Sequence, residues 1–284
     1  EAQFQTTALS SWAAGADISA NEQTRFPRSL TLNVSTVNPL NFSVESFFEV
    51  PGMVPGFNPD RTNNVNTVAL FLENRTKLGS KLSLVTGLRR DRISLEVTNF
   101  RAVSATAPAY FKNIYNPVTG RAALAFAVAK SANIYGQFST AADPPAGILT
   151  TASFAQVRDF DLTTGRQFEV GTKLDLPGGR GALTAAVYGI VRKNLAITDP
   201  ANPSLTIPVG QHSSKGLELS ASIRASKALL VQGNYGYTDA QYDDFLESVA
   251  GVAVSRAGNR PTGVPVHVSN AWLTYTGIPK WTAT

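Results

Sequence analysis

The chain has 284 residues and a net charge of +5, and charged residues make up 16% of it, well below the roughly 25% of an ordinary soluble domain. With a mean hydropathy of −0.05, the chain is polar without being highly charged, which suits a surface that alternately faces lipid and a wet interior. The lack of cysteine excludes disulfides and thiolate metal sites, and the mild, scattered positive charge gives no support for nucleic-acid binding.

The first clear strand pair surrounds a short turn at residues 78–81. Leu70 and Leu72 share one face before this turn, and after it Leu82, Leu84, Thr86 and Leu88 alternate with Ser83, Val85, Gly87, Arg89 and Asp91. Period-two alternation of this length predicts β-strands with two different faces.

The same unit recurs farther along the chain. Residues 122–129, the longest apolar run, are far short of the ~20 residues of a membrane helix, whereas a transmembrane strand needs only ~9–11. Gly and small polar residues at the turns permit the tight geometry of hairpins. These predicted turns lie at Lys130-Ser131, Pro177-Gly178-Gly179-Arg180 and Ala225-Ser226-Lys227.

Long segments rich in Pro, Gly, Asn, Asp and Thr separate these hairpins. Short and long connections therefore alternate, and a transmembrane barrel has short periplasmic turns and longer external loops. We expect an all-β fold, an antiparallel transmembrane β-barrel to which this chain contributes about twelve strands of ~9–14 residues. The predicted long loops are residues 49–64, 96–120, 142–164, 194–212 and 240–265.

Three segments carry a family pattern. They are "FDLTTGRQFEVGTKLDLPGGRGALTAAVYGIVRKNLAITDP", "GQHSSKGLELSASIRASKALLVQGNYGYTDAQY" and "GNRPTGVPVHVSNAWLTY". In this order they resemble the late barrel strands of TonB-dependent outer-membrane receptors, and of siderophore receptors in particular. The matching positions include Thr164, Gly165, Gln167, Glu169, Gly171, Arg192, Lys193, Asn194, Gly210, Ser214, Gly216, Glu218, Tyr235, Tyr237, Thr238, Ala240, Gly258, Asn259, Pro261, Pro265 and His267.

The resemblance implies a barrel of ~22 strands with a plugged lumen. On this interpretation residues 1–284 are a barrel segment, roughly the seventh to eighteenth strands, and the plug and final strands lie outside it. The complete protein is then expected in the bacterial outer membrane as a monomer, surrounded by lipid. There it takes up ferric siderophore complexes with energy delivered by TonB through the plug, and no nucleic acid is involved.

No pattern in the sequence indicates an enzyme, a cofactor or a metal site, since the two histidines lack metal-ligand spacing. Residues opposite the apolar stripes are instead expected to line the barrel lumen, where a plug or a solute could contact them. These candidates are Arg89, Asp91, Gln167, Glu169, Lys173, Glu218, Ser220, Gln232 and Asn234.

Ligand capture in such a receptor is expected from aromatic and Arg side chains in the external loops, which offer stacking and cation contacts. The candidates are Tyr110, Phe111, Tyr115, Arg158 and Arg256.

Two alternatives stay open on the sequence. One is a barrel without a plug, acting as a passive porin or a secretion channel. The other is a soluble all-β binding module, which requires the stripe of Leu217, Leu219 and Ile223 to be buried against a second sheet.

Overall fold

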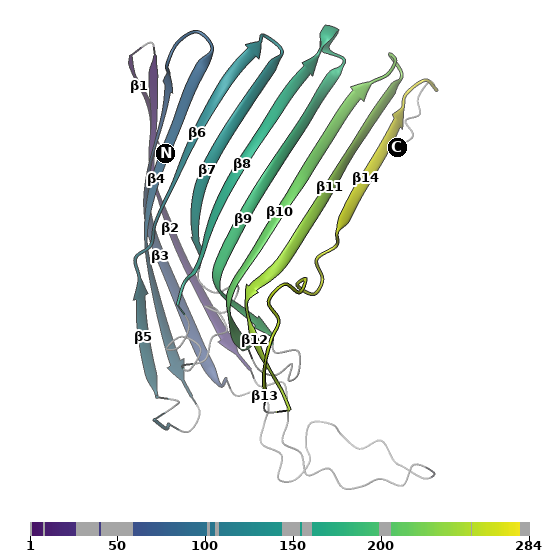
Figure 1. The fold of residues 1–284 in the computed structure, drawn as a ribbon. Helices are drawn as coiled ribbons and strands as arrows, with labels where there is room; N and C mark the ends of the chain where they lie inside the picture. The colour runs from purple at the N-terminus through teal and green to yellow at the C-terminus, as the bar shows by residue number, and fades with distance from the viewer. Residues whose placement is uncertain are drawn as a thin grey trace.

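The strands form one curved, fully antiparallel wall (Figure 1). The computed structural model describes residues 2–7, 9–26, 40, 59–100, 103–105, 108–143, 154, 161–198, 206–250 and 252–278. Within these residues a 12-stranded sheet follows the order β1-β2-β3-β4-β6-β7-β8-β9-β10-β11-β14, with β5 paired to β4, and β12 and β13 form a separate pair. No helix in this part of the chain is long and apolar enough to cross a membrane.

Sequence neighbours pair along almost the whole sheet. The strands are β1 (Ala2–Thr7), β2 (Ser10–Arg25), β3 (Arg61–Lys77), β4 (Leu82–Asn99), β5 (Tyr110–Tyr115), β6 (Val118–Ala129), β7 (Ala132–Asp143), β8 (Thr163–Leu176), β9 (Gly181–Thr198), β10 (Thr206–Arg224), β11 (Leu229–Asp244), β12 (Leu246–Val249), β13 (Val252–Ser255) and β14 (His267–Tyr275).

The predicted short turns are confirmed, and all of them lie at one end of the wall, the top in Figure 1. The turn between β8 and β9 contains a single 3-10 turn, Pro177–Gly179. Gly178 and Gly179 have φ of 70° and 68°, a left-handed conformation that glycine adopts without steric cost. We refer to this end as the short-turn end and to the opposite end as the long-connection end.

The predicted long loops are wrong in extent, because several strands continue far beyond the expected ~9–14 residues. β4 and β9 have 18 residues and β10 has 19. Residues 96–120, expected to be loop, are mostly strand, since they contain the end of β4, all of β5 and the start of β6. Backbone hydrogen bonding between strands continues through these residues. The alternation of side chains expected of a strand that faces lipid ends before them.

β5 and β6 continue one another along β4 and are separated only by Asn116 and Pro117. Proline has no backbone N–H to give to a sheet, but its carbonyl still accepts a 3.0 Å hydrogen bond from the Asp91 N–H. Pairing to β7 is recorded for β6 and not for β5 within the described residues. In Figure 1, β5 accordingly stays beside β4 but lies apart from β7 at the long-connection end.

The two faces of the wall differ in character along the half nearest the short turns. Directly opposed residues of antiparallel strands share a face, so the register can be followed across the sheet from Arg89 on one face and Leu88 on the other. We call these the Arg89 face and the Leu88 face. On the Leu88 face Leu70, Leu88 and Phe168 are 64%, 60% and 58% exposed.

Many other large apolar side chains are exposed on the Leu88 face. They include Val68, Leu72, Leu124, Phe126, Ile134, Phe138, Val170, Val187, Leu219 and Val231. A soluble sandwich would bury this stripe, yet Leu219 is 40% exposed and the described residues place no second sheet over it. An exposed apolar band of this extent is the outer surface of a membrane barrel.

Candidate functional site

All nine residues predicted to line a lumen share the Arg89 face. Three of them lie on β8, where Gln167, Glu169 and Lys173 are directly opposite Ile190, Tyr188 and Thr184 of β9. These residues of β9 are in turn opposite residues of β10. The same face continues there through Ser214, Gly216, Glu218 and Ser220, and on β11 through Asn234 and Gln232. In the other direction it passes from Gln167 through Ser139 and Arg121 to Gly87, and so to Arg89 and Asp91. The polar candidates thus form one surface.

Ion pairs join distant strands on this face. The Arg89 guanidinium lies between two carboxylates, with Nη1 donating to Asp17 Oδ2 at 2.5 Å and Nη2 to Asp91 Oδ1 at 2.8 Å. Arg121 of β6 reaches over β4 to pair with Glu73 of β3. The charges of Arg89 and Arg121 are therefore compensated within the wall.

A second network lies on β7 and β8. The Tyr135 hydroxyl donates to Glu169 Oε1 at 2.6 Å, and Gln167 Nε2 donates to Glu169 Oε2 at 2.9 Å. Lys173 Nζ lies 5.8 Å from the centre of the Tyr135 ring. A methyl group built on Gly171 would lie 2.6 Å from the Tyr135 hydroxyl oxygen, so the absence of a side chain at Gly171 lets Tyr135 lie across its neighbour strand.

The character of the Arg89 face reverses toward the long-connection end. Beyond Asp91 it carries Ile93, Leu95 and Val97, which are 5%, 0% and 4% exposed and form an apolar cluster with Tyr115 of β5. Val65, Phe111 and Leu162 pack against this cluster. On the opposite face the same stretch of β4 turns polar, with Arg90, Arg92, Ser94, Glu96 and Thr98.

The candidate ligand contacts on β5 need a correction, because they lie on a strand rather than in a loop. Tyr115 is 8% exposed within the apolar cluster, and its burial raises the pKa of its hydroxyl. Phe111 packs against the cluster and meets Phe154 edge-on, with ring centres 4.9 Å apart. Only Tyr110, 53% exposed on the Leu88 face, has an open surface among these three.

The other two candidate ligand contacts are Arg158 and Arg256. Arg158 lies outside the described residues. Arg256 lies in the predicted loop, just after β13, and its Nε donates to Glu247 Oε2 at 2.5 Å. Glu247 is 8% exposed, so Arg256 neutralises a buried carboxylate and closes the β12–β13 hairpin. The Arg256 guanidinium is therefore already engaged by Glu247, and fewer of its N–H groups are free to contact a ligand.

A polar cluster joins the ends of β10 and β11. The Asp243 carboxylate accepts hydrogen bonds from Gln211 at 2.9 Å, Ser213 at 2.7 Å and Gln241 at 3.1 Å. Burial raises the pKa of Asp243, but these hydrogen bonds favour the charged form and the net pKa is lowered. Burial lowers the pKa of the neighbouring His212, and Arg192 lowers it further.

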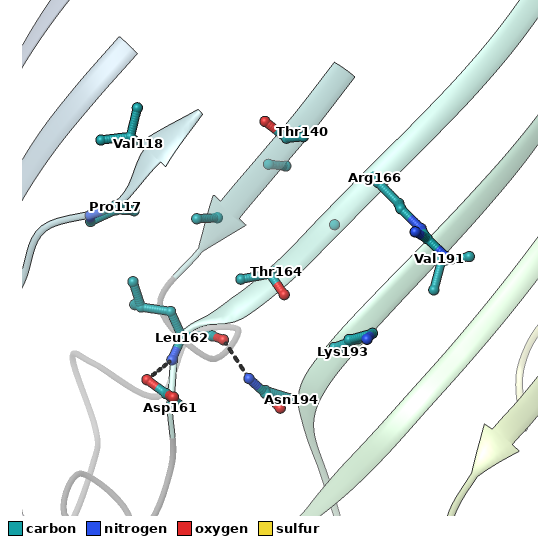
Figure 2. Close-up of a pocket in the computed structure, with 13 residues that line it drawn as sticks. Pro117, Val118, Thr140, Asp161, Leu162, Thr164, Arg166, Val191, Lys193 and Asn194 are labelled. Carbon is teal, nitrogen blue, oxygen red and sulfur yellow. Dashed lines mark hydrogen bonds between the residues drawn. The ribbon is translucent and has the colours of Figure 1, made fainter. Parts of the chain in front are cut away.

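A pocket of about 540 Å³ opens where β6, β7, β8 and β9 end (Figure 2). Asn194 adopts φ 56° here, a left-handed conformation that Asn tolerates better than most residues. Its side-chain amide donates to the Leu162 carbonyl at 3.2 Å, and Thr163 Oγ1 donates to the Asn194 carbonyl at 2.8 Å. These bonds hold the start of β8 against the end of β9.

Sequence reasoning assigned no binding role to Arg166 and Lys193, which line this pocket. Both belong to the Leu88 face, since Arg166 opposes Val191 and Thr164 opposes Lys193. The sequence feature that could have identified Arg166 is its position on β8, two residues before Phe168, where the alternating apolar residues of that strand begin. No group of three or more His, Cys, Asp or Glu residues suited to a metal occurs in the described part of the chain.

Long antiparallel strands with an exposed apolar band on one face and a polar, ion-paired surface on the other define part of a transmembrane β-barrel. The family model for the TonB dependent receptor-like β-barrel matches residues 1–284. The chain therefore belongs to the TonB-dependent receptor family, as part of its β-barrel in the bacterial outer membrane.

Individual relatives support the same placement. The metal-pseudopaline receptor CntO of Pseudomonas aeruginosa is 26% identical over 234 residues, which are 80% of this chain and 31% of that protein. The ferrioxamine B receptor of Salmonella typhimurium is 32% identical over 163 residues, 56% of this chain and 21% of that protein. The chain spans less than a third of the length of these relatives.

The solved structures are similar in fold. The siderophore receptor PiuA from Acinetobacter baumannii superposes with a TM-score of 0.71 at 22% identity, covering 99% of this chain and 43% of that one. The predicted all-β, antiparallel barrel architecture is thereby confirmed, as an open wall of a larger barrel.

Proposed function

We propose that the complete protein is an outer-membrane receptor that binds ferric siderophore complexes at its external end and transports them inward with energy from TonB. Residues 1–284 form the middle and late part of its barrel wall. The plug, which contacts TonB, and the closing strands belong to other parts of the protein. The receptor works as a monomer surrounded by outer-membrane lipid and catalyses no reaction.

The observation that carries this proposal is the continuous polar surface on the Arg89 face, set against an exposed apolar band on the Leu88 face. A barrel that encloses a plug and a hydrophilic cargo needs this pairing of surfaces. Two relatives that are 32% identical over 163 and 118 residues are a ferrioxamine B receptor and a ferrichrome outer membrane transporter. They support an iron–siderophore cargo for this chain.

The polar surface suits passage better than tight binding. Arg89 and Arg121 are neutralised by carboxylates of neighbouring strands, and Glu169 is held by Tyr135 and Gln167. A path must bind its solute weakly enough to release it. A wall that compensates Arg89, Arg121 and Glu169 within itself offers hydrogen bonds to a plug or cargo without presenting these charges as a strong electrostatic trap.

The test is uptake of radioactive iron by bacterial cells that lack their own siderophore receptors and express the complete protein. Ferrioxamine B and ferrichrome are the first complexes to supply. We expect saturable uptake of at least one ferric complex, and its loss in an otherwise identical strain without TonB. Absence of saturable binding or uptake for every ferric chelate supplied would contradict the siderophore assignment.

The same experiment separates the receptor from a passive pore. Uptake that persists without TonB and rises linearly with concentration would indicate a barrel without a plug. Liposomes containing the complete protein would then swell in solutions of small sugars, whereas a plugged receptor leaves them unchanged.

A further inference from the structure

Three aromatic side chains on the Arg89 face lie directly opposite a glycine of the neighbouring strand. Because directly opposed residues of antiparallel strands share a face, each ring and its glycine lie side by side on the surface that faces the lumen. The pairs are Tyr135 with Gly171, Tyr188 with Gly216 and Phe71 with Gly15. The same pairing therefore occurs at three separate places in the wall.

The glycines leave the space in which the rings lie flat on the wall. A methyl group built on Gly171 would lie 2.6 Å from Tyr135 Oη and 2.7 Å from Tyr135 Cζ. One built on Gly15 would lie 2.7 Å from Phe71 Cε1. Non-bonded carbon atoms are most favourable about 3.5–4.0 Å apart. A side chain at either glycine would therefore push the ring off the wall and toward the lumen.

Hydrogen bonds hold the two tyrosine rings in this orientation. The Tyr135 hydroxyl donates to Glu169 Oε1 at 2.6 Å. The Tyr188 hydroxyl reaches over β10 and lies 3.1 Å from Thr238 Oγ1 of β11. A methyl group built on Gly216 would lie 2.5 Å from this hydroxyl oxygen, so the reach of Tyr188 also depends on a glycine. Both tyrosines therefore lie along the wall instead of projecting from it.

Arg121 shows the same arrangement for a charged side chain. It lies opposite Gly87 of β4, where a methyl group would be 3.2 Å from Arg121 Cγ. Arg121 passes over this strand to its ion pair with Glu73 of β3. Large side chains of β3, β6, β7 and β9 are thus laid over glycines, and the wall projects little into the lumen at these positions.

We infer that three of these glycines are positioning residues for transport, because they keep aromatic rings out of the path along which the cargo passes between wall and plug. They are Gly15, Gly171 and Gly216. This role rests on the proposed function, since only a barrel that moves a bulky cargo needs a clear path along its wall. It concerns passage and not capture, because the rings lie in the membrane-spanning half of the wall and the cargo is captured at the external end.

Gly171→Ala in the complete protein is the direct test, because the three atoms nearest to a methyl group there all belong to Tyr135. Initial rates of radioactive iron uptake are measured over a range of ferrioxamine B and ferrichrome concentrations. We expect a lower maximal rate and an unchanged half-saturation concentration. Gly171→Ala with Tyr135→Ala should restore the maximal rate, since no ring remains to be raised.

Gly236→Ala is the matched control. Gly236 lies on the same face, on β11 opposite Glu218, and a methyl group built there has no atom within 4 Å beyond its two chain neighbours. We expect this variant to import iron at the wild-type rate, and migration on unheated gels shows that each variant is folded. Equal maximal rates for Gly171→Ala and Gly236→Ala would overturn the proposal, and so would a reduced rate that Tyr135→Ala does not restore.

Urea unfolding in detergent micelles separates this proposal from the proposed function, because it needs no cargo. Overpacking by the added methyl group should lower the folding equilibrium constant of Gly171→Ala about 5- to 30-fold. In a double-mutant cycle, Tyr135→Ala should cancel most of that loss. If wild type imports no ferric complex, the siderophore assignment fails by itself. Additive losses in the cycle would overturn the placement of the ring by Gly171, and coupled losses would support it.

Discussion

The two halves of β4 show opposite arrangements of the same two kinds of residue. Near the short turns, Leu84 and Leu88 lie on the Leu88 face, and polar residues lie on the Arg89 face. Toward the long connections, Leu95 is fully buried on the Arg89 face and Glu96 lies on the Leu88 face, paired with Lys112 at 2.6 Å. The alternation continues, but its phase reverses between Leu88 and Ile93.

The reversal follows from what surrounds each half. Lipid surrounds the first half, so its outer side is apolar and its inner side polar. Water surrounds the second half, so its outer side is polar and the chain packs its apolar residues inward, as in a soluble protein. The phase change on β4 therefore marks the height at which the wall leaves the membrane. Arg90 and Arg92, both exposed, lie at this boundary.

The largest effect is expected from Leu95→Ala in the second half. Leu95 is 0% exposed in the apolar cluster, and truncating a buried leucine costs about 2–5 kcal/mol. Urea unfolding of the complete protein in detergent micelles, followed by hydrogen exchange in β4 and β5, measures the loss. Leu88→Ala is the matched variant on the exposed band and should cost clearly less. Equal losses would remove the distinction between the two halves.

The next effect concerns the first half, through Val187→Arg. Val187 is 53% exposed on the apolar band of β9, and a cation near the middle of that band costs about 2–4 kcal/mol. Thr184→Arg places the same charge on the Arg89 face of the same strand and should be tolerated. Folding free energies in lipid vesicles give the comparison, and a greater cost at Thr184 would reverse the assignment of faces.

A smaller effect is expected from pH at the ends of β10 and β11. The pKa of His212 is lowered from its ordinary value of 6.5 because burial disfavours the charged ring. The unfolded strand end binds the proton more readily, so the local stability is complete above pH 6.5 and decreases as pH falls below it.

Asp243 adds a second step in the same direction. Its net pKa is below the ordinary 3.8, so its contribution is present above that pH and is lost as pH falls through the lowered value. Hydrogen exchange of peptides from residues 211–213 and 241–244 should therefore speed up on acidification, after correction for intrinsic rates. His212→Gln should remove the upper step and leave the lower one; an unchanged upper step would contradict the assignment to His212.

The smallest effect is expected from Lys112→Gln. Its ion pair with Glu96 lowers the pKa of that carboxyl through a hydrogen bond, but both side chains contact solvent, where ion pairs add little to stability. We expect the urea midpoint to stay within experimental error of wild type. A large shift would show that this part of the Leu88 face is covered rather than open to water.

The sequence predicted the first half of β4 well. A strand between lipid and a polar interior keeps its apolar side chains on one face and its polar side chains on the other along its whole length. Leu82, Leu84 and Leu88 and the short turns belong to this half. The second half was missed because its apolar residues change face, so Ile93, Leu95 and Val97 no longer extend the expected stripe. Tyr115 illustrates the consequence: a residue chosen as a loop contact is a core residue on β5.

The candidate site divides in the same way. Alternation alone placed the nine polar residues on one face, since a period of two fixes the side of every residue in a strand. The proximity of Arg166 and Lys193 could not be predicted, because it depends on the register between β8 and β9, which the local sequence does not determine. The ion pair of Arg256 with Glu247 depends on a hairpin that the Gly- and Pro-containing composition of residues 240–265 did not indicate.

Spin labelling along β4 tests the central claim most directly, and the lack of native cysteine makes single-cysteine labels straightforward. Labels at positions 84 to 97 of the complete protein in lipid vesicles are compared for accessibility to oxygen, which concentrates in lipid, and to a water-soluble nickel complex. Even positions up to 88 should be accessible to oxygen, and even positions from 92 onward to nickel. Positions 93, 95 and 97 should be accessible to neither. Oxygen accessibility that continues at even positions through 96 would contradict the phase reversal and the membrane boundary drawn from it.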